Sequence, residues 1–300
     1  MTAIKSIRTK ATIAIVIVSL IYASIGIPVR VLASHFTLFQ QLYLWLTAST
    51  ILSCLLFVKN IRWHVYRRLS LWDIIILTGR ALAFYTIGYS LYSTGITNAK
   101  YGSVAVIYAF PMMAVLGPLF LGEKLTNFKL GAVIGAVIGA LFIGLKDVTS
   151  VVSFGFGELA TLVSVFFFAV SDVARKFQSE RLNNYEMTVF MFVVATVSTF
   201  FLSVAVGEPL APLNWSTPVF AAVLATGLMN ALALLFTNYG YKYLDVITAG
   251  TISYVDTAFG IIISIILYKE IPTIKEAFGG LLIVASALFI HHVASRQPDS

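Results

Sequence analysis

The chain has 300 residues, of which 59% are hydrophobic and 11% are charged. Soluble domains carry about 25% charged residues, so this composition, with a mean hydropathy of +0.92, excludes a soluble globular enzyme and a disordered chain. The length allows about ten membrane helices of ~20 residues, with loops too short for a folded extramembrane domain. We therefore expect an all-α integral membrane protein whose surroundings are the lipid bilayer.

Ten long apolar stretches predict ten transmembrane helices. They cover residues 11–33, 37–58, 72–93, 101–121, 128–145, 154–174, 186–206, 217–241, 246–267 and 277–293. Pro28, Pro111 and Pro118 lie inside such stretches, which membrane helices tolerate because their neighbours satisfy the freed backbone groups. Basic residues precede the first stretch and suggest a signal peptide. The stretch is too long for one and nine more follow, so we assign it as the first helix.

The lysines and arginines predict the orientation in the membrane. Fourteen lie on the side of the N-terminus and five on the opposite side, while Arg80 lies inside the third stretch. Because short cytoplasmic loops are rich in Lys and Arg, both termini are expected in the cytoplasm of a multi-pass cell-membrane protein. The net charge of +7 therefore indicates topology, and we expect no nucleic-acid partner.

The two halves of the chain repeat at a spacing near 147. Glu123 with Thr126 matches Glu270 with Thr273, and Ala-Leu-Phe-Ile occurs at 140–143 and again at 287–290. Five helices in each half is an odd number, so the second half enters the bilayer from the opposite side. We therefore expect two inverted five-helix repeats, at 1–147 and 148–300. Such repeats surround a site near the midplane and are typical of alternating access.

One stretch resembles the EamA-type signature of the drug/metabolite transporter superfamily. It runs Tyr101-Gly102-Ser103-Val104-Ala105, then Tyr108, Pro111, Leu121-Gly122-Glu123-Lys124-Leu125 and Gly131. The second half departs from it, because Tyr268-Lys269-Glu270 replaces Gly-Glu-Lys and Asp256 stands near the position of the proline. The resemblance implies a secondary transporter that exports small polar metabolites, such as amino acids or related compounds, and that pairs as a homodimer through the last helix of each half.

Polar side chains recur on single faces of several predicted helices. The ninth has Gly250, Ser253, Thr257, Gly260 and Ser264 in steps of three and four. An unpaired polar group in hydrocarbon costs several kcal/mol, so such faces turn away from lipid. The alternative is a helix–helix interface, which also favours small and hydroxyl residues. The candidate cavity-lining residues are Arg80, Tyr85, Tyr89, Tyr108, Asp172, Asn230, Thr237, Tyr254, Asp256 and Thr257.

Arg80 and Asp256 lie near the middle of their predicted helices, and Asp172 lies towards the cytoplasmic end of its own. A charge at the bilayer centre costs about 2.5–3.5 kcal/mol on insertion scales, so it must face a partner or water. We expect Arg80 to face the central cavity, paired with Asp172, Asp256 or a substrate carboxylate. A purely structural ion pair is the alternative.

The fifth helix carries a different pattern. Gly131, Gly135 and Gly139 repeat every four residues, and no polar side chain lies between 130 and 144. Glycines on one face let two backbones approach closely, so we expect these three at a helix contact.

The sequence has no Walker loop, no metalloprotease or hydrolase motif and a single cysteine, Cys54. We expect no enzyme activity, no cofactor and no metal site. Glu123 and Glu270 are either proton carriers or structural residues, each of which caps the following helix or anchors its loop. The alternatives to a metabolite exporter are an importer or antiporter of nucleotide-linked or cofactor-like solutes, and a membrane-embedded enzyme or scaffold. The 14 tyrosines either bind a quaternary amine through cation–π contacts or serve packing and the membrane interface.

Overall fold

The computed structural model describes residues 2–99, 104, 107–108, 110–144, 155–212, 214–269 and 273–296. These residues form helices and connections, with no strand among them. Eight helices are long and apolar enough to cross a membrane, and the apolar helices Met112–Leu121 and Asn127–Ile143 are shorter. The expected all-α integral membrane protein is confirmed at this level.

The first half begins with two uninterrupted helices, and its third predicted helix has three parts. The elements are α1 (Thr2–Ala33), α2 (Leu38–Leu56), the short 3-10 turns η1 (Val58–Asn60) and η2 (Trp63–Arg68), α3 (Leu71–Ala81), the π-helical turn η3 (Leu82–Gly88), α4 (Tyr89–Asn98), α6 (Met112–Leu121) and α7 (Asn127–Gly144). Ser70 starts α3 with a capping box, in which its hydroxyl accepts from the N–H of Asp73.

The second half contains α8 (Phe156–Ala174), the 3-10 turn η5 (Arg175–Phe177), α9 (Asn184–Ala205), α10 (Thr217–Tyr243), α11 (Val246–Ser253), α12 (Val255–Tyr268) and α13 (Ile274–Arg296). The ninth predicted helix is thus two helices that meet at Tyr254. Asp245 starts α11 by accepting from the N–H of Thr248 at 2.9 Å, an N-cap of the usual kind.

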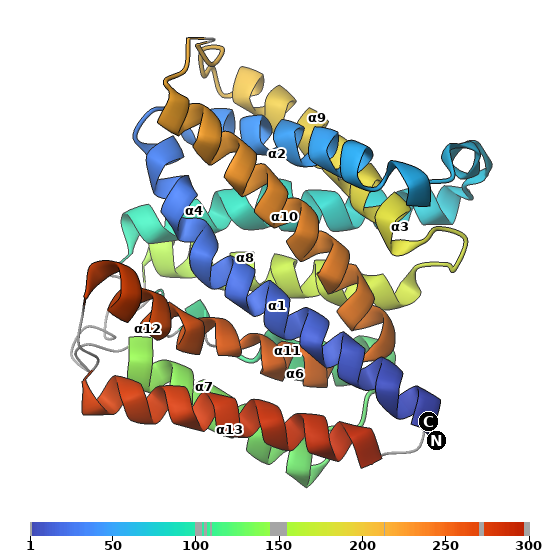
Figure 1. Ribbon diagram of the computed structural model, residues 1–300, viewed down its shortest axis with the longest axis vertical. Helices are drawn as coiled ribbons and strands as arrows, with labels where there is room; N and C mark the ends of the chain where they lie inside the picture. Colours follow the sequence, from blue (N-terminus) through green and yellow to red (C-terminus); the bar gives the residue numbers. More distant parts are fainter. Residues whose placement is uncertain are drawn as a thin grey trace.

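The helices pack side by side as a bundle. Figure 1 shows α2 and α9 at one edge and α7 and α13 at the opposite edge, with α1, α10, α8 and the α3–η3–α4 segment between them. In the interior α1 packs on α10, and α8 packs on α3, η3 and α4. One apolar core lies among α2, η3, α9 and α10, and a second lies among α1, α7, α11 and α13.

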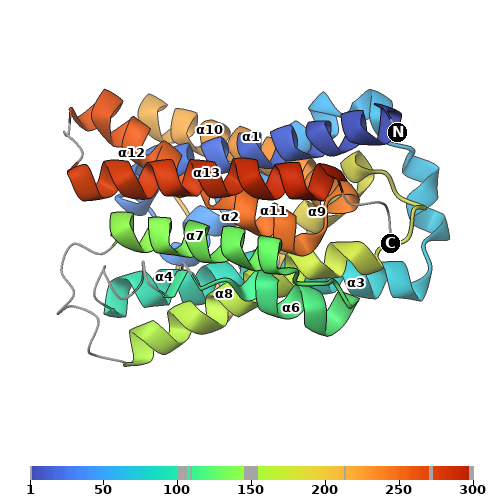
Figure 2. The ribbon, with the colours of Figure 1, turned by 90° about the horizontal axis from the view of Figure 1, so that it is seen from below.

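Both ends of the described chain lie at one end of the bundle, which we call the terminal end. Figure 2 shows the start of α1, the end of α13 and the α2–α3 connection there. Arg8 Nη1 donates to the carbonyl oxygen of Ala294 at 2.6 Å. Since the fourteen basic residues counted above flank the helix ends on this side, the terminal end is the basic end of the molecule.

Two of the three glycines of α7 lie at a close contact with α13. A Cβ added at Gly139 would lie 2.6 Å from the carbonyl oxygen of Gly279, and one at Gly135 would lie 2.5 Å from Ser286 Oγ. At Gly131 an added Cβ would meet no described atom within 4 Å. The predicted close contact therefore differs along the helix: α7 and α13 touch at Gly135 and Gly139 and leave open space at Gly131.

Candidate substrate site

A continuous set of aromatic rings runs through the bundle interior. The rings of Tyr85 and Tyr89 stack with centroids 6.5 Å apart and an interplanar angle of 13°. Phe168 of α8 then contacts Tyr89 at 6.0 Å and Tyr92 at 6.2 Å, and Tyr92 contacts Tyr108 at 5.5 Å. Three of the predicted cavity residues, Tyr85, Tyr89 and Tyr108, therefore belong to one aromatic column.

The π-helical turn η3 lies where this column approaches α8. Single π turns in α-helices are frequent at functional sites, because they shift the side chains that follow by part of a turn. Gly88 ends the turn, and a Cβ there would lie 2.6 Å from Phe168 Cε1. The small residue lets α8 come close enough for Phe168 to insert between Phe84 and Tyr89, with ring centroids at 4.8 and 6.0 Å.

Asp172 lies next to the column on α8. The Tyr241 hydroxyl of α10 donates to its carboxylate, and Arg80, Tyr85 and Tyr22 lie within range of direct electrostatic interaction. The Asp172 side chain is half-buried. Its charge is therefore compensated by a hydroxyl donor and a neighbouring cation.

Asp256 lies at the start of α12 and has different surroundings. Its Oδ1 accepts from the hydroxyl of Thr257 at 3.0 Å, and Tyr108 and Tyr254 lie within electrostatic range. No described lysine or arginine comes within ion-pair distance of this half-buried carboxylate. Asp256, Thr257, Tyr254 and Tyr108 thus lie together, as a set separate from Asp172.

Arg80 is 1% exposed and donates to three neutral oxygens. Its Nε reaches the carbonyl oxygen of Ser171 at 2.9 Å, Nη1 reaches Gln178 Oε1 at 3.0 Å, and Nη2 reaches Asn238 Oδ1 at 2.8 Å. The ion pair expected with Asp172 or Asp256 is not found, since neither carboxylate lies within 4.0 Å of the guanidinium. The dipoles of these three neutral groups, and not a carboxylate, stabilise the positive charge of Arg80.

Sequence reasoning missed the residues that hold Arg80. Gln178 lies just after η5 and looks like an ordinary loop residue, and Asn238 follows Thr237 without marking a face of its own. Asn238 also donates to Thr188 Oγ1 at 3.2 Å, and its carbonyl accepts from Arg175 Nε at 3.2 Å. The available signal was the buried arginine itself, which requires acceptors from its neighbours.

Three buried polar atoms of α10 and the aromatic column have no hydrogen-bond partner among the described residues. They are Tyr85 OH, Thr226 Oγ1 and Asn230 Oδ1. Asn230 does donate to the carbonyl oxygen of Thr226 at 3.0 Å. Buried polar atoms are normally paired, so a set of unpaired ones in one region indicates water or a ligand.

At the terminal end, Glu123 joins the two halves of the chain. Its carboxylate accepts from the N–H groups of Val246 at 2.8 Å and Ile247 at 3.1 Å. It therefore caps α11. The cap of the following helix, α7, which the sequence had suggested, is not what this carboxylate forms. Burial raises the pKa of Glu123, while the two N–H donors act in the opposite direction. Glu270, the expected counterpart, lies outside the described residues.

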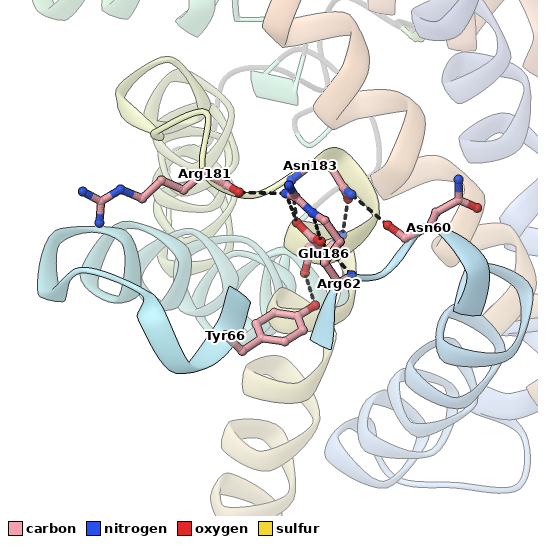
Figure 3. A network of polar contacts seen from close by, with 6 residues as sticks. All are labelled: Asn60, Arg62, Tyr66, Arg181, Asn183 and Glu186. Atoms are coloured by element: carbon pink, nitrogen blue, oxygen red, sulfur yellow. Dashed lines mark hydrogen bonds and ion pairs between the residues drawn. The ribbon is translucent and has the colours of Figure 1, made fainter. Parts of the chain in front are cut away.

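A second polar network at this end fastens the α2–α3 connection to α9. Glu186 is 0% exposed and accepts from Arg62 N at 2.8 Å, from Arg62 Nε at 2.9 Å and from Asn183 N at 2.8 Å. Figure 3 shows Tyr66 donating to the Glu186 carbonyl and Asn183 reaching the carbonyl of Asn60. This network lies away from the aromatic column and serves the fold.

Comparison with known proteins agrees with the sequence signature. Residues 155–291 match the EamA-like transporter family. The second half of the chain therefore resembles this family. Two relatives, the biotin transporters of Escherichia coli strain K12 and of Escherichia coli O157:H7, are each 27% identical over 173 residues, which cover 55% of this chain. The match spans 56% of the length of these biotin transporters, about half of each.

The fold also has a counterpart among solved structures. One crystal structure superposes with a TM-score of 0.73 over 98% of this chain and 99% of its own, at 18% sequence identity. At that identity the likeness concerns the fold alone. The expected resemblance to the drug/metabolite transporter superfamily is confirmed by the family match and by the similarity to the biotin transporters.

Proposed function

We propose that this protein is a secondary transporter that exports small polar metabolites across the cell membrane by alternating access. The observation that carries the proposal is the placement of the site between the two halves of the chain. Tyr85, Tyr89 and Tyr108 come from the first half, and Asp172 and Asp256 come from the second. A rocking motion of one half against the other would expose such a site first to one side and then to the other.

The packing of the helices supports two inverted repeats of five spans, at 1–147 and 148–300. With an offset near 147, α1 corresponds to α8, and α10 corresponds to the α3–η3–α4 segment. The contact of α1 with α10 then mirrors the contact of α8 with α3, η3 and α4. In the three remaining equivalent pairs, α2 packs on α9, α7 packs on α13, and α6 contacts α11 of the α11–α12 span. This pattern is the one that a two-fold axis between the halves requires.

Contacts at the terminal end favour a closed gate on that side. Glu123 caps α11, Lys176 Nζ donates to the carbonyl of Leu244 at 2.5 Å, and Lys129 pairs with Asp245 at 3.0 Å. The contacts of Glu123 and Lys129 join the first half to the second, and the contact of Lys176 holds the α10–α11 connection. With both termini in the cytoplasm, as the basic residues favour, this closed side is the cytoplasmic side.

The test is solute exchange by the purified full chain in proteoliposomes. Vesicles loaded with unlabelled phenylalanine should accumulate labelled phenylalanine faster than protein-free vesicles, because exchange needs only the two access states. Labelled phenethylamine and labelled biotin are measured in parallel. A chain that binds one of these solutes without exchanging it in sealed vesicles contradicts the proposed transport.

A second candidate substrate class is a cofactor-like solute such as biotin. The specific observation in its favour is the similarity to the two biotin transporters. Against it stands Arg80, the cation expected to bind a carboxylate, whose three nitrogens already donate to Ser171, Gln178 and Asn238. Exchange of biotin, without exchange of phenylalanine, would favour this second candidate.

A further inference from the structure

We propose that the site around Asp256 selects an organic cation, a protonated or quaternary amine on an apolar body, as the transported solute. This inference rests on the proposed transport function and names its substrate class. Two geometric observations carry it. The Asp256 carboxylate has the Thr257 hydroxyl as a donor at 3.0 Å and no ion pair with a described residue, and the partly exposed ring of Tyr108 lies at the end of the aromatic column.

The two interior aspartates differ in the groups that already stabilise their negative charge. Asp172 has the Tyr241 hydroxyl as a donor and Arg80 as a neighbouring cation. Asp256 has the Thr257 hydroxyl at 3.0 Å and no ion pair with a described residue. A carboxylate at this depth requires a counter-charge or a proton. Asp256 is therefore the group for which a cationic solute supplies the missing partner.

The rings around Asp256 suit the carbon body of such a solute. Tyr108 contacts Tyr92 with centroids 5.5 Å apart, and Tyr108 is 45% exposed, so part of its ring surface is open. Aromatic faces attract ammonium groups through the ring quadrupole, most strongly where water is excluded. A carboxylate and partly open tyrosine rings together bind a cation better than either group does alone.

The arginines beside the site do not offer an equivalent place for an anion. Arg80 donates to Ser171, Gln178 and Asn238 as described, and Arg175 donates to the Asn238 carbonyl and to Asn184 Oδ1 at 3.1 Å. These bonds use three of the five N–H groups of Arg80 and two of the five of Arg175, and both side chains are buried, at 1% and 3% exposed. Neutral acceptors therefore already stabilise both cations, and neither depends on a solute carboxylate as Asp256 depends on a cation. The site therefore discriminates against carboxylates and favours amines.

Independent polar atoms near the column point to a bound molecule. Tyr85 OH and Asn230 Oδ1 are unpartnered, in side chains that are 0% and 1% exposed. Tyr85 lies within electrostatic range of Tyr89 and Asp172. A hydroxyl group of the solute, or a water molecule bound to the solute, would give these atoms a hydrogen-bond partner. We therefore expect them to lie beside the end of the solute that is opposite the amine.

The experiment measures binding of three matched probes to the purified full chain. Phenethylamine is a cation, phenylalanine adds a carboxylate to it, and 3-phenylpropionate keeps only the carboxylate. Thermal stabilisation as a function of probe concentration gives each affinity, since only a ligand of the folded state raises the melting temperature. Phenethylamine should bind roughly tenfold or more tighter than 3-phenylpropionate, with phenylalanine between them.

The variants separate the two carboxylates. Asp256→Asn should weaken phenethylamine binding roughly tenfold or more, because it removes the charge with little change of shape. Asp172→Asn should weaken binding less than Asp256→Asn does, because Asp172 is already compensated. Glu180→Gln is the control and should leave binding unchanged, because the Glu180 carboxylate is 70% exposed and pairs with Lys242. Asp256→Glu retains the charge and should restore most of the affinity if Asp256→Asn folds poorly. Tyr108→Phe should keep phenethylamine binding, and Tyr108→Leu should weaken it several-fold.

Three results overturn the inference: equal binding of 3-phenylpropionate and phenethylamine, unchanged phenethylamine binding by Asp256→Asn, or no saturable binding of phenethylamine. Failure of the transport function looks different. If phenethylamine binds through Asp256 but is not exchanged in proteoliposomes, the selectivity stands and the transport proposal fails. If biotin is exchanged and phenethylamine does not bind, transport stands and the selectivity fails.

Discussion

Thr50 and Thr196 share a hydrogen bond of 3.2 Å between their hydroxyl oxygens, and they are 146 positions apart in the chain. Thr50 lies on α2 and Thr196 lies on α9, the second helix of each proposed repeat. Under a two-fold relation, a residue meets its own equivalent only on the axis. This pair therefore marks the place where the proposed axis passes between α2 and α9.

The pair predicts a disulfide. In a Cys54→Ala background, Thr50→Cys with Thr196→Cys should oxidise readily, since the two hydroxyl oxygens already lie at 3.2 Å. Thiol labelling of the denatured chain after mild oxidation measures the result. Thr50→Cys with Ser198→Cys is the control, because the Ser198 hydroxyl instead contacts Thr86 at 2.7 Å. Full labelling of the first pair would contradict the α2–α9 contact.

The glycines of α7 give a graded stability prediction. Gly139→Ala should lower the melting temperature, because its Cβ would lie 2.6 Å from the Gly279 carbonyl and 2.7 Å from Ile283 Cγ1. Overpacking of this kind costs about 1–3 kcal/mol. Gly131→Ala is the matched control on the same helix, and it should be neutral or slightly stabilising. Equal melting temperatures for the two variants would show that α7 and α13 do not touch at Gly139.

We expect Arg80 to stabilise the fold and not to bind the substrate. Arg80→Ala leaves three buried neutral acceptors without a donor, and each unsatisfied buried group costs about 1–3 kcal/mol, so the melting temperature and the yield of folded protein should fall. Arg80→Lys should recover part of the loss because an ammonium reaches one or two of the acceptors. An unchanged melting temperature, together with loss of phenylalanine and phenethylamine binding, would instead place Arg80 in the substrate site.

The network of Figure 3 predicts a rescue. Arg62→Ala should lower the melting temperature, because it leaves the 0% exposed carboxylate of Glu186 without its cation. Adding Glu186→Gln should recover part of that loss, since a neutral amide oxygen can still accept from Asn183 N. Arg181→Ala is the control, because its side chain is 61% exposed and only its carbonyl joins the network. A double variant less stable than Arg62→Ala would refute this charge pairing.

The orientation has its own test. Fourteen basic residues flank the helix ends at the terminal end, which predicts that this end faces the cytoplasm. Alkaline phosphatase, which matures only outside the cytoplasm, should be inactive when fused after Ser300, and a fluorescent protein that matures inside should be bright. The opposite pattern would reverse the assignment of sides and turn the closed end outwards.

Hydropathy predicted the eight long apolar helices because lipid requires such segments whatever their neighbours are. In the described parts of the fourth and fifth predicted spans, the structure has the shorter helices Met112–Leu121 and Asn127–Ile143. Hydropathy could not predict the π turn at Leu82–Gly88 or the break of the ninth helix at Tyr254. Both interruptions depend on neighbouring helices, such as the approach of Phe168 to Gly88. Local sequence carries no signal for such contacts. The regular spacing of Gly131, Gly135 and Gly139 likewise does not reveal where two tilted helices separate.

The sequence identified the charged and aromatic residues that lie in the interior, but it did not identify the groups that they contact. Charged and aromatic residues deep in apolar stretches marked Arg80, Asp172, Asp256 and the tyrosines, because their burial demands compensation. Which groups provide that compensation depends on helix rotation and register. Gln178 and Asn238, and not a carboxylate, therefore hold Arg80 in the folded chain.

The proposed site between the two halves should carry a solute across the membrane. The most direct test is exchange of labelled phenethylamine and phenylalanine in proteoliposomes, with the wild-type chain and Asp256→Asn compared at equal amounts of folded protein. The wild-type chain should accumulate label, fastest for phenethylamine, and Asp256→Asn should lose most of that rate. Binding of either probe without any accumulation above protein-free vesicles would contradict the proposed transport.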